Sequence, residues 1–299
     1  MDLLNRGEIP WRKPWKTNGG MPRNLISGKP YRGVNVFLLH SMHYESPFWL
    51  TFKQALDLGG NVRKGEKACP VIFWRTFDKL DADTGKTDKI PMMRLYYCFN
   101  VAQCENIPAD KLPTLPDAET TPDATDYAHA GQIWQEYPNA PTLKHGMAKA
   151  YYSPGGDYIG MPDSARFATM GHYYATLFHE AIHSTGHASR LARRKDDEDR
   201  AYGSADYSKE ELTAEMGAAF LCGMAGIGET GGLIENSAAY IQNWLQALRN
   251  DKRLIVQAAG LAQRAADHIL NTKFDSAESL PAEIVTTTQT VNQPETVAA

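Results

Sequence analysis

The sequence has few cysteines and no long apolar run. Its four cysteines form no C-x-x-C pair, which argues against a disulfide framework and favours a reducing, cytosolic setting. No apolar run reaches the roughly 18 residues that a membrane span needs, and the opening MDLLNRGEIPW lacks the apolar core of a signal peptide. We therefore expect a cytoplasmic protein with no membrane partner.

The sequence also lacks a strong net charge, because its total is only −4. Residues 1–105, however, carry 16 Lys and Arg against 10 Asp and Glu, whereas residues 106–299 carry 15 against 25. The two halves are thus +6 and −10, which sum to −4. A local basic surface is the footprint expected for a polyanion such as nucleic acid, so the halves are expected to meet different partners.

Two segments have the composition of linkers. Residues 106–125 hold four prolines and almost no large apolar residue, and residues 273–299 are rich in Thr, Glu and Val without a helical period. The expected organisation is therefore an N-terminal domain (1–105), a linker (106–125), a C-terminal domain (126–272) and a disordered tail (273–299).

The N-terminal half predicts a small antiparallel sheet with helices. A helix is expected over residues 31–40, a strand over 49–52, and two strands over 67–77 and 92–102 that are joined by a polar turn. Between them, Thr51 and Gln54 fit a capping box at the start of a helix, and Gly59 fits its end. This half is therefore α+β.

The C-terminal half predicts mainly helices with a small sheet. The helices are expected at about 126–137, 170–186, 208–225 and 237–271, with one strand at 158–162. The whole chain is therefore expected to be a two-domain α+β protein.

The segment YYATLFHEAIHSTGH contains H-E-x-x-H, as His179, Glu180 and His183. On a helix, positions i and i+4 share a face, so both imidazoles can bind one metal ion while Glu180 acts beside them as general base. A third ligand is needed, and Ser189 stands where a metzincin would have its third histidine. The motif is therefore not that of a metzincin.

The third ligand is expected on a second helix, in SKEELTAEMGAAFL. Ser208 and Glu211 fit a capping box there, which gives Glu211 a structural role and leaves Glu215 as the favoured ligand. Glu211 and His187 remain alternatives. Small residues after Glu215 would let the two helices pack closely.

Two histidines and a glutamate leave a coordination position open, as in catalytic sites. The expected ion is Zn2+, although this donor set also accepts ions such as Mn2+. The implied reaction is hydrolysis of an amide. Residues 151–162 either supply an edge strand for an extended peptide or simply close the sheet, and Tyr207 and His187 are candidate donors to the oxyanion.

The N-terminal half interleaves tryptophans with basic residues. Single-stranded nucleic acid is bound by this combination, because cations follow the backbone while flat rings stack on bases. Trp49 and Trp74 are expected in the core, and Trp11 and Trp15 on the surface. The predicted DNA-binding residues are Trp11, Arg12, Lys13, Trp15, Lys16, Arg32, Lys53, Arg63, Lys64 and Lys67.

Several long stretches of the chain occur in the order found in one known family. They include PWRKPW, PRNLISGKPYRGVNVFLL, FWLTFKQALDLGG and VRKGEKACPVIFW in the N-terminal half. The C-terminal half adds YYSPGGDYIGMP, the H-E-x-x-H segment and YSKEELTAEMGAAFL. Over about residues 8–272 the chain thus resembles the ArdC-type antirestriction proteins.

The resemblance implies an N-terminal domain that binds single-stranded DNA and a C-terminal domain that looks like a zinc metallopeptidase. It also implies a protein that protects incoming conjugative plasmid DNA from host restriction. Carried over, the ligands are His179, His183 and Glu215, with Glu180 as base. Double-stranded DNA is expected to bind more weakly, and no protein substrate is identified. The alternative hypothesis is a DNA-recruited or regulatory metallopeptidase whose main activity is proteolysis.

Overall fold

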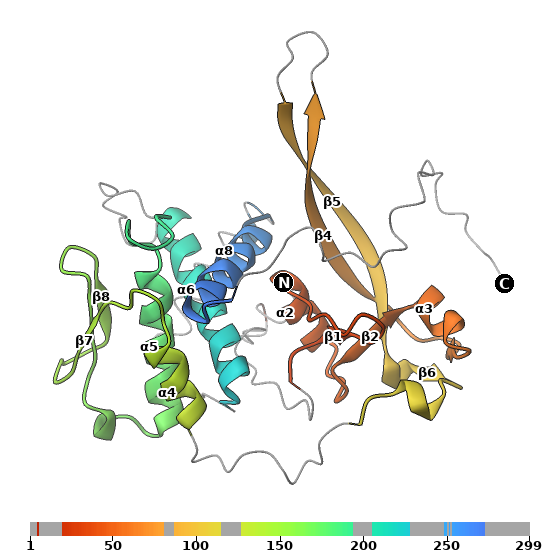
Figure 1. The fold of residues 1–299 in the computed structure, drawn as a ribbon, viewed down its shortest axis with the longest axis horizontal. Coiled ribbons are helices and arrows are strands. Elements are labelled where there is room, and N and C mark those ends of the chain that lie inside the picture. The colour runs from red at the N-terminus through yellow and green to blue at the C-terminus, as the bar shows by residue number, and fades with distance from the viewer. Residues whose placement is uncertain are drawn as a thin grey trace.

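The computed structural model describes residue 5 and residues 20–80, 87–114, 127–193, 205–227, 248–249, 251 and 253–272. Side chains are described in these ranges except at residues 74–80, 88–93 and 205–206. Three small sheets and several helices make a mixed α+β structure, with the N-terminal sheet on one side and the helices of the C-terminal half on the other (Figure 1). The predicted fold class is confirmed.

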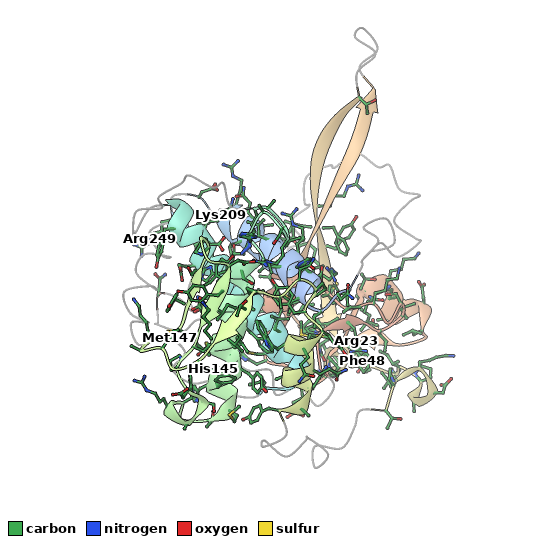
Figure 2. The ribbon with its side chains drawn as sticks, turned by 60° about the vertical axis from the view of Figure 1, so that its left-hand side comes forward. Arg23, Phe48, His145, Met147, Lys209 and Arg249 are labelled. Carbon is green, nitrogen blue, oxygen red and sulfur yellow. The ribbon has the colours of Figure 1, made fainter. Side chains whose placement is uncertain are left out.

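A four-stranded sheet organises the N-terminal half, in the order β1-β2-β5-β4. Strand β1 (Arg23–Asn24) lies parallel to β2 (Phe48–Thr51), and Arg23 is level with Phe48, as Figure 2 shows. Strand β4 (Cys69–Leu80) pairs antiparallel along its whole length with β5 (Thr87–Asn100), and the two strands project as a long twisted hairpin (Figure 1).

One face of this sheet is buried beneath helix α2 (Val34–His40). Trp49, Val71 and Cys98 point to this face and form a cluster with Leu39 of α2. Trp49 is therefore a core residue, as the sequence predicted. The side chain of Trp74 lies outside the described residues. The Asn35 amide also exchanges hydrogen bonds with the backbone of Ile72 at 2.7 and 2.8 Å, which holds α2 against the edge strand β4.

Helix α3 (Phe52–Asp57) follows β2 directly and begins at the predicted capping box. The Thr51 hydroxyl accepts from the Gln54 backbone N–H, and the Gln54 side chain accepts from that of Thr51. Gly59, just after the helix, has φ of +84°. Beyond it, β3 (Asn61–Val62) pairs with β6 (Cys104–Glu105), and the 3-10 turn η1 (Val101–Gln103) joins β5 to β6.

The C-terminal half is built on long helices. They are α4 (Ala128–Gln135), α5 (Met170–Ser184), α6 (Ala205–Ala225) and α8 (Arg253–Ile269). A three-stranded sheet, in the order β7-β9-β8, contains β7 (Thr142–Lys144), β8 (Tyr151–Ser153) and β9 (Tyr158–Gly160). A short 3-10 turn, η4 (Ser164–Arg166), precedes α5.

The largest hydrophobic cluster crosses the boundary between the predicted domains. Phe37 of α2 stacks on Phe220 of α6 with ring centroids 4.9 Å apart, and Val34 and Val36 belong to the same cluster as α5, α6 and α8. Arg32 forms an ion pair with Asp267 of α8. Helix α2 thus packs on both halves of the chain.

Several expected elements have different bounds or lie outside the described residues. Helix α6 begins by Ala205, earlier than the predicted position 208. The 3-10 turn η2 (Ala109–Lys111) lies in the predicted linker. The predicted tail (273–299) and residues 237–247, 250 and 252 of the last predicted helix are outside the described ranges. Among the described residues, no helix is long and apolar enough to cross a membrane.

Candidate functional site

The H-E-x-x-H motif lies in the last two turns of α5. The helix is capped by Thr169, whose hydroxyl accepts from the His172 backbone N–H at 3.2 Å. One turn separates His179 from His183, and their Nε2 atoms lie 3.1 Å apart. The predicted pair of imidazoles is therefore brought together on one helix face.

Helix α6 adds a carboxylate at the same point. The two oxygens of Glu211 each lie 3.6 Å from an Nε2 atom, one beside His179 and the other beside His183. These three residues are the described group able to hold a metal ion. Ligands about 2.1 Å from a tetrahedral zinc are about 3.4 Å from one another, so the observed separations of 3.1 and 3.6 Å fit one ion.

Two further glutamates of α6 lie at the other nitrogens of these rings. Nδ1 of His179 is 3.5 Å from a Glu215 oxygen, and Nδ1 of His183 is 3.0 Å from a Glu210 oxygen. A carboxylate at Nδ1 fixes the ring and directs Nε2 toward a metal. All five side chains therefore fit a centre in which α5 supplies the imidazoles and α6 supplies one ligand and two supports. Lys209, labelled in Figure 2, precedes these glutamates on α6.

The geometry differs from the sequence-based expectation, which favoured Glu215 as the third ligand and kept Glu211 as an alternative, because Glu211 is the carboxylate grouped with the two histidines. The prediction rested on Ser208 capping a helix, but α6 begins by Ala205, so Ser208 is buried inside the helix. Glu211 consequently has no capping role. Glu215 is one turn further on and lies at Nδ1 of His179, away from the point where both Nε2 atoms meet.

Arg193 holds the support of His183 in place. Its Nη2 donates to the same Glu210 oxygen at 2.8 Å and to the backbone oxygen of Ile182 at 2.6 Å, and its Nη1 donates to the Thr185 hydroxyl at 2.8 Å. No sequence pattern signals this role, since Arg193 is one of several basic residues in the segment SRLARRK.

The electrostatics of the site favour a cation. Burial opposes charge on His179, but hydrogen bonding to Glu211 and the charges of Glu215 and Glu180 outweigh it and raise the His179 pKa to about 9. Burial also opposes ionisation of Glu211, yet His179 and His183 lower its pKa. In the metal-free protein a proton thus balances part of the negative charge that a divalent ion would balance.

Close helix packing brings the two sets of donors together. Gly217 of α6 faces Ile182 of α5, and a Cβ atom at Gly217 would lie 2.6 Å from Ile182 Cδ1. Glycine allows this approach without displacing Ile182, because real Cβ contacts are essentially never so short. The expectation of close packing is confirmed at this position.

The other predicted residues of this half lie around the donors. Glu180 is buried beside His179. His187 bonds Ser189 through Nδ1 at 2.8 Å and is not part of the metal-holding group. Tyr207 is half-buried in α6, where it interacts with another group of the protein.

The hairpin of residues 151–162 is fixed to the end of α5. Arg190, whose side chain is 1% exposed, forms an ion pair with Asp157 in the turn of this hairpin and donates to the Ser184 backbone oxygen at 2.7 Å. Strand β9 is paired on both sides, whereas β7 and β8 are each paired on one side, so β8 is one of the two edge strands of this sheet.

The predicted DNA-binding residues fall into three groups. The first group, Trp11, Arg12, Lys13, Trp15 and Lys16, lies outside the described residues. The second is held in internal contacts: Arg32 pairs with Asp267, and Arg63 pairs with Glu66 at 2.7 Å and donates to the Ala102 and Cys104 backbone oxygens. The third group, Lys53, Lys64 and Lys67, is exposed.

Comparison with protein families supports both halves of the chain. Residues 1–99 match the N-terminal domain of anti-restriction factor ArdC, and residues 134–261 match a zincin-like metallopeptidase. The second match covers α5 and α6, which carry the candidate ligands. The chain therefore contains a zincin-like metallopeptidase domain.

Two curated proteins are similar to most of the chain. The chain is 36% identical over 278 residues to the uncharacterized protein y4eC of Sinorhizobium fredii (strain NBRC 101917 / NGR234), covering 88% of this chain and 86% of that one. It is 35% identical over 293 residues to DNA primase TraC of Escherichia coli, which covers 90% of this chain but only 26% of the primase.

Two solved structures are similar over nearly the whole chain. The metal-free antirestriction protein ArdC from plasmid R388 has a TM-score of 0.69 and 38% identity, over 91% of this chain and 96% of that one. Its Mn(II)-bound structure has a TM-score of 0.69 and 36% identity, over 94% and 96%. With a family match in each half and similarity over 96% of a solved relative, this chain belongs to the ArdC family of antirestriction proteins.

Proposed function

We propose that this protein binds single-stranded DNA through its N-terminal half and carries a metal-dependent peptidase site in its C-terminal half. In this proposal it protects incoming conjugative plasmid DNA from restriction in the cytoplasm of a recipient cell. The observation that carries the proposal is the convergence of two imidazoles and one carboxylate, each imidazole supported at its second nitrogen.

In the proposed site, His179, His183 and Glu211 hold a divalent ion, zinc or manganese. Such an ion polarises a carbonyl group and acidifies water at neutral pH. Glu180 accepts the proton of the attacking water and passes it to the leaving amine, so that one water and one amide become an acid and an amine. Glu215 and Glu210 orient the rings, and β8 offers an edge along which an extended peptide can pair.

Metal analysis of the purified protein tests this site directly. We expect about one equivalent of zinc or manganese after dialysis against the ion, and none in the double variant His179→Ala, His183→Ala. Glu211→Gln should lose most of the affinity, because it removes a ligand, whereas Glu215→Gln should lose about 10- to 100-fold, because it removes a support. Stronger loss in Glu215→Gln than in Glu211→Gln would restore the sequence-based assignment.

DNA binding is proposed from the basic charge of residues 1–105, from the match of this half to the ArdC N-terminal domain, and from the similarity to a DNA primase. Affinity for a labelled oligonucleotide should fall as salt rises, because phosphate contacts release counterions. Absence of binding at low salt would refute this half of the proposal.

The two activities can be separated in a plasmid-transfer assay. If protection depends on DNA binding alone, Trp11→Ala with Arg12→Ala removes it and Glu180→Ala leaves it intact. Loss of protection in Glu180→Ala, with metal and DNA binding retained, would favour the second candidate, a DNA-recruited peptidase. The match to a zincin-like metallopeptidase is the observation that favours this second candidate.

A further inference from the structure

Exposed apolar side chains gather on the face of the N-terminal sheet opposite helix α2. In β5, Leu95 is 55% and Tyr97 59% exposed, and in α3, Phe52 and Leu56 are each 49% exposed. Soluble proteins rarely leave such side chains side by side unless they meet a partner.

The register shows that these residues share one surface. Alternate residues of a strand point to the same face, so Leu95, Tyr97 and Phe99 form a row with steps of about 6.7 Å. Cys98, between them, points to the buried face. The row ends at α3, because the rings of Phe99 and Phe52 meet edge to face with centroids 6.5 Å apart. We call Phe52, Leu95, Tyr97 and Phe99 the aromatic face, in which the rings of Phe52 and Tyr97 are exposed and that of Phe99 is half-buried.

Cationic residues lie at the same end of the sheet. Lys53 follows Phe52 on α3 and is exposed. Exposed Lys64 and Lys67 lie in the turn before β4, and the Gln103 side chain, just after β5, donates to the Lys67 backbone oxygen at 2.9 Å. Pro70, three residues beyond Lys67, stands directly opposite Tyr97.

We propose that the aromatic face stacks unpaired bases of single-stranded DNA while the neighbouring lysines contact its phosphates. The inference rests on the proposed function and assigns residues to it. Rings beside cations suit an unpaired strand, because each base offers a flat surface that is hidden in a duplex. The aromatic face thus adds a stacking platform on the sheet.

The test is oligonucleotide binding by the full chain across a salt titration. Tyr97→Leu keeps an apolar side chain but removes the ring, and should weaken binding about 5- to 150-fold at every salt concentration, with the salt slope unchanged. Tyr97→Phe should bind like the unaltered protein. Lys67→Ala should instead reduce the slope by about 0.7, because one phosphate contact is lost.

Matched controls separate stacking from unfolding. Tyr158→Leu makes the same change in the C-terminal sheet and should leave binding intact, and far-ultraviolet circular dichroism and metal content should be unchanged in every variant. Quenching of 2-aminopurine in the oligonucleotide should decrease in Tyr97→Leu and in Phe52→Leu.

If both of these variants bind and quench like the unaltered protein while its binding depends on salt, the aromatic face is refuted and the proposed function stands. If the unaltered protein shows no salt-dependent binding, both fail. Loss of self-association in Tyr97→Leu with DNA binding unchanged would show that the face meets a second copy of the chain, and would also overturn the inference.

Discussion

Replacing Gly217 by alanine tests whether close packing of α5 on α6 builds the metal centre. Within a helix, alanine is favoured over glycine by about 1 kcal/mol. Here the new Cβ would lie 2.6 Å from Ile182 Cδ1 and 2.7 Å from Cγ1, so the helices must separate or Ile182 must leave its rotamer. Such overpacking costs about 1 to 3 kcal/mol. Gly217→Ala should therefore destabilise the protein by up to about 2 kcal/mol.

Gly260 of α8 provides the matched control. It also lies inside a helix, it is exposed, and a Cβ placed there has no atom within 4 Å apart from its chain neighbours and the backbone of its own helix. Gly260→Ala should therefore stabilise the protein by about 0.5 to 1 kcal/mol. The difference between the two variants isolates the contact with Ile182, since the gain in helix propensity is common to both.

The assay is urea unfolding followed by circular dichroism in the presence of a chelator, so that metal binding does not add to stability. Metal affinity is then measured separately. Gly217→Ala should bind zinc more weakly, because separating the helices moves Glu211 away from the two Nε2 atoms, whereas Gly260→Ala should not change affinity. Equal stabilisation by both substitutions, with unchanged affinity, would refute the close approach as the basis of the site.

Three other perturbations have expected outcomes. Glu210→Gln should weaken zinc binding about 10- to 100-fold, as measured with a competing chelator, and Arg193→Met should weaken it less, because the carboxylate stays but loses its anchor. Hydrogen bonding by Arg190 lowers the Asp157 pKa below its usual 3.8, so the ion pair stabilises the protein fully above pH 3.8 and ceases to do so as the pH falls further. The free energy of unfolding of Asp157→Asn should therefore be lower than that of the unaltered protein near neutral pH, and the difference should disappear at acid pH. Since the His179 pKa is about 9, zinc binding near pH 7.5 should release about one proton from His179. The buffer takes up this proton, so the calorimetric heat of zinc binding should differ between buffers, and equal heats in all buffers would contradict the prediction.

Local patterns of the sequence predicted local structure well. The capping box at Thr51 and Gln54 and the buried position of Trp49 follow from neighbouring residues and from strand composition. The two histidines share a face because helix periodicity places positions i and i+4 together. These features depend on interactions within a few residues, which a single sequence records directly.

Features that depend on contact between distant segments could not be predicted from local sequence patterns. The choice between Glu211 and Glu215 depends on where α6 begins and how it lies on α5, which the S-x-x-E pattern at Ser208 misrepresents. The exposure of Tyr97 could not be predicted from the sequence either, because a strand rich in apolar residues is expected to be buried until its neighbours are known. The ion pair of Arg32, a predicted DNA-binding residue, could not be predicted either, because its partner Asp267 is 235 residues away.

The stack of Phe37 on Phe220 bears on how the protein can be divided. The proline-rich segment after residue 105 invites cutting the chain there, but a fragment ending at that point would present Val34, Val36 and Phe37 to water. The matching fragment would lose the partner of Phe220. We therefore expect the two halves to unfold as one cooperative unit, and each half expressed alone to aggregate unless the other is supplied in trans.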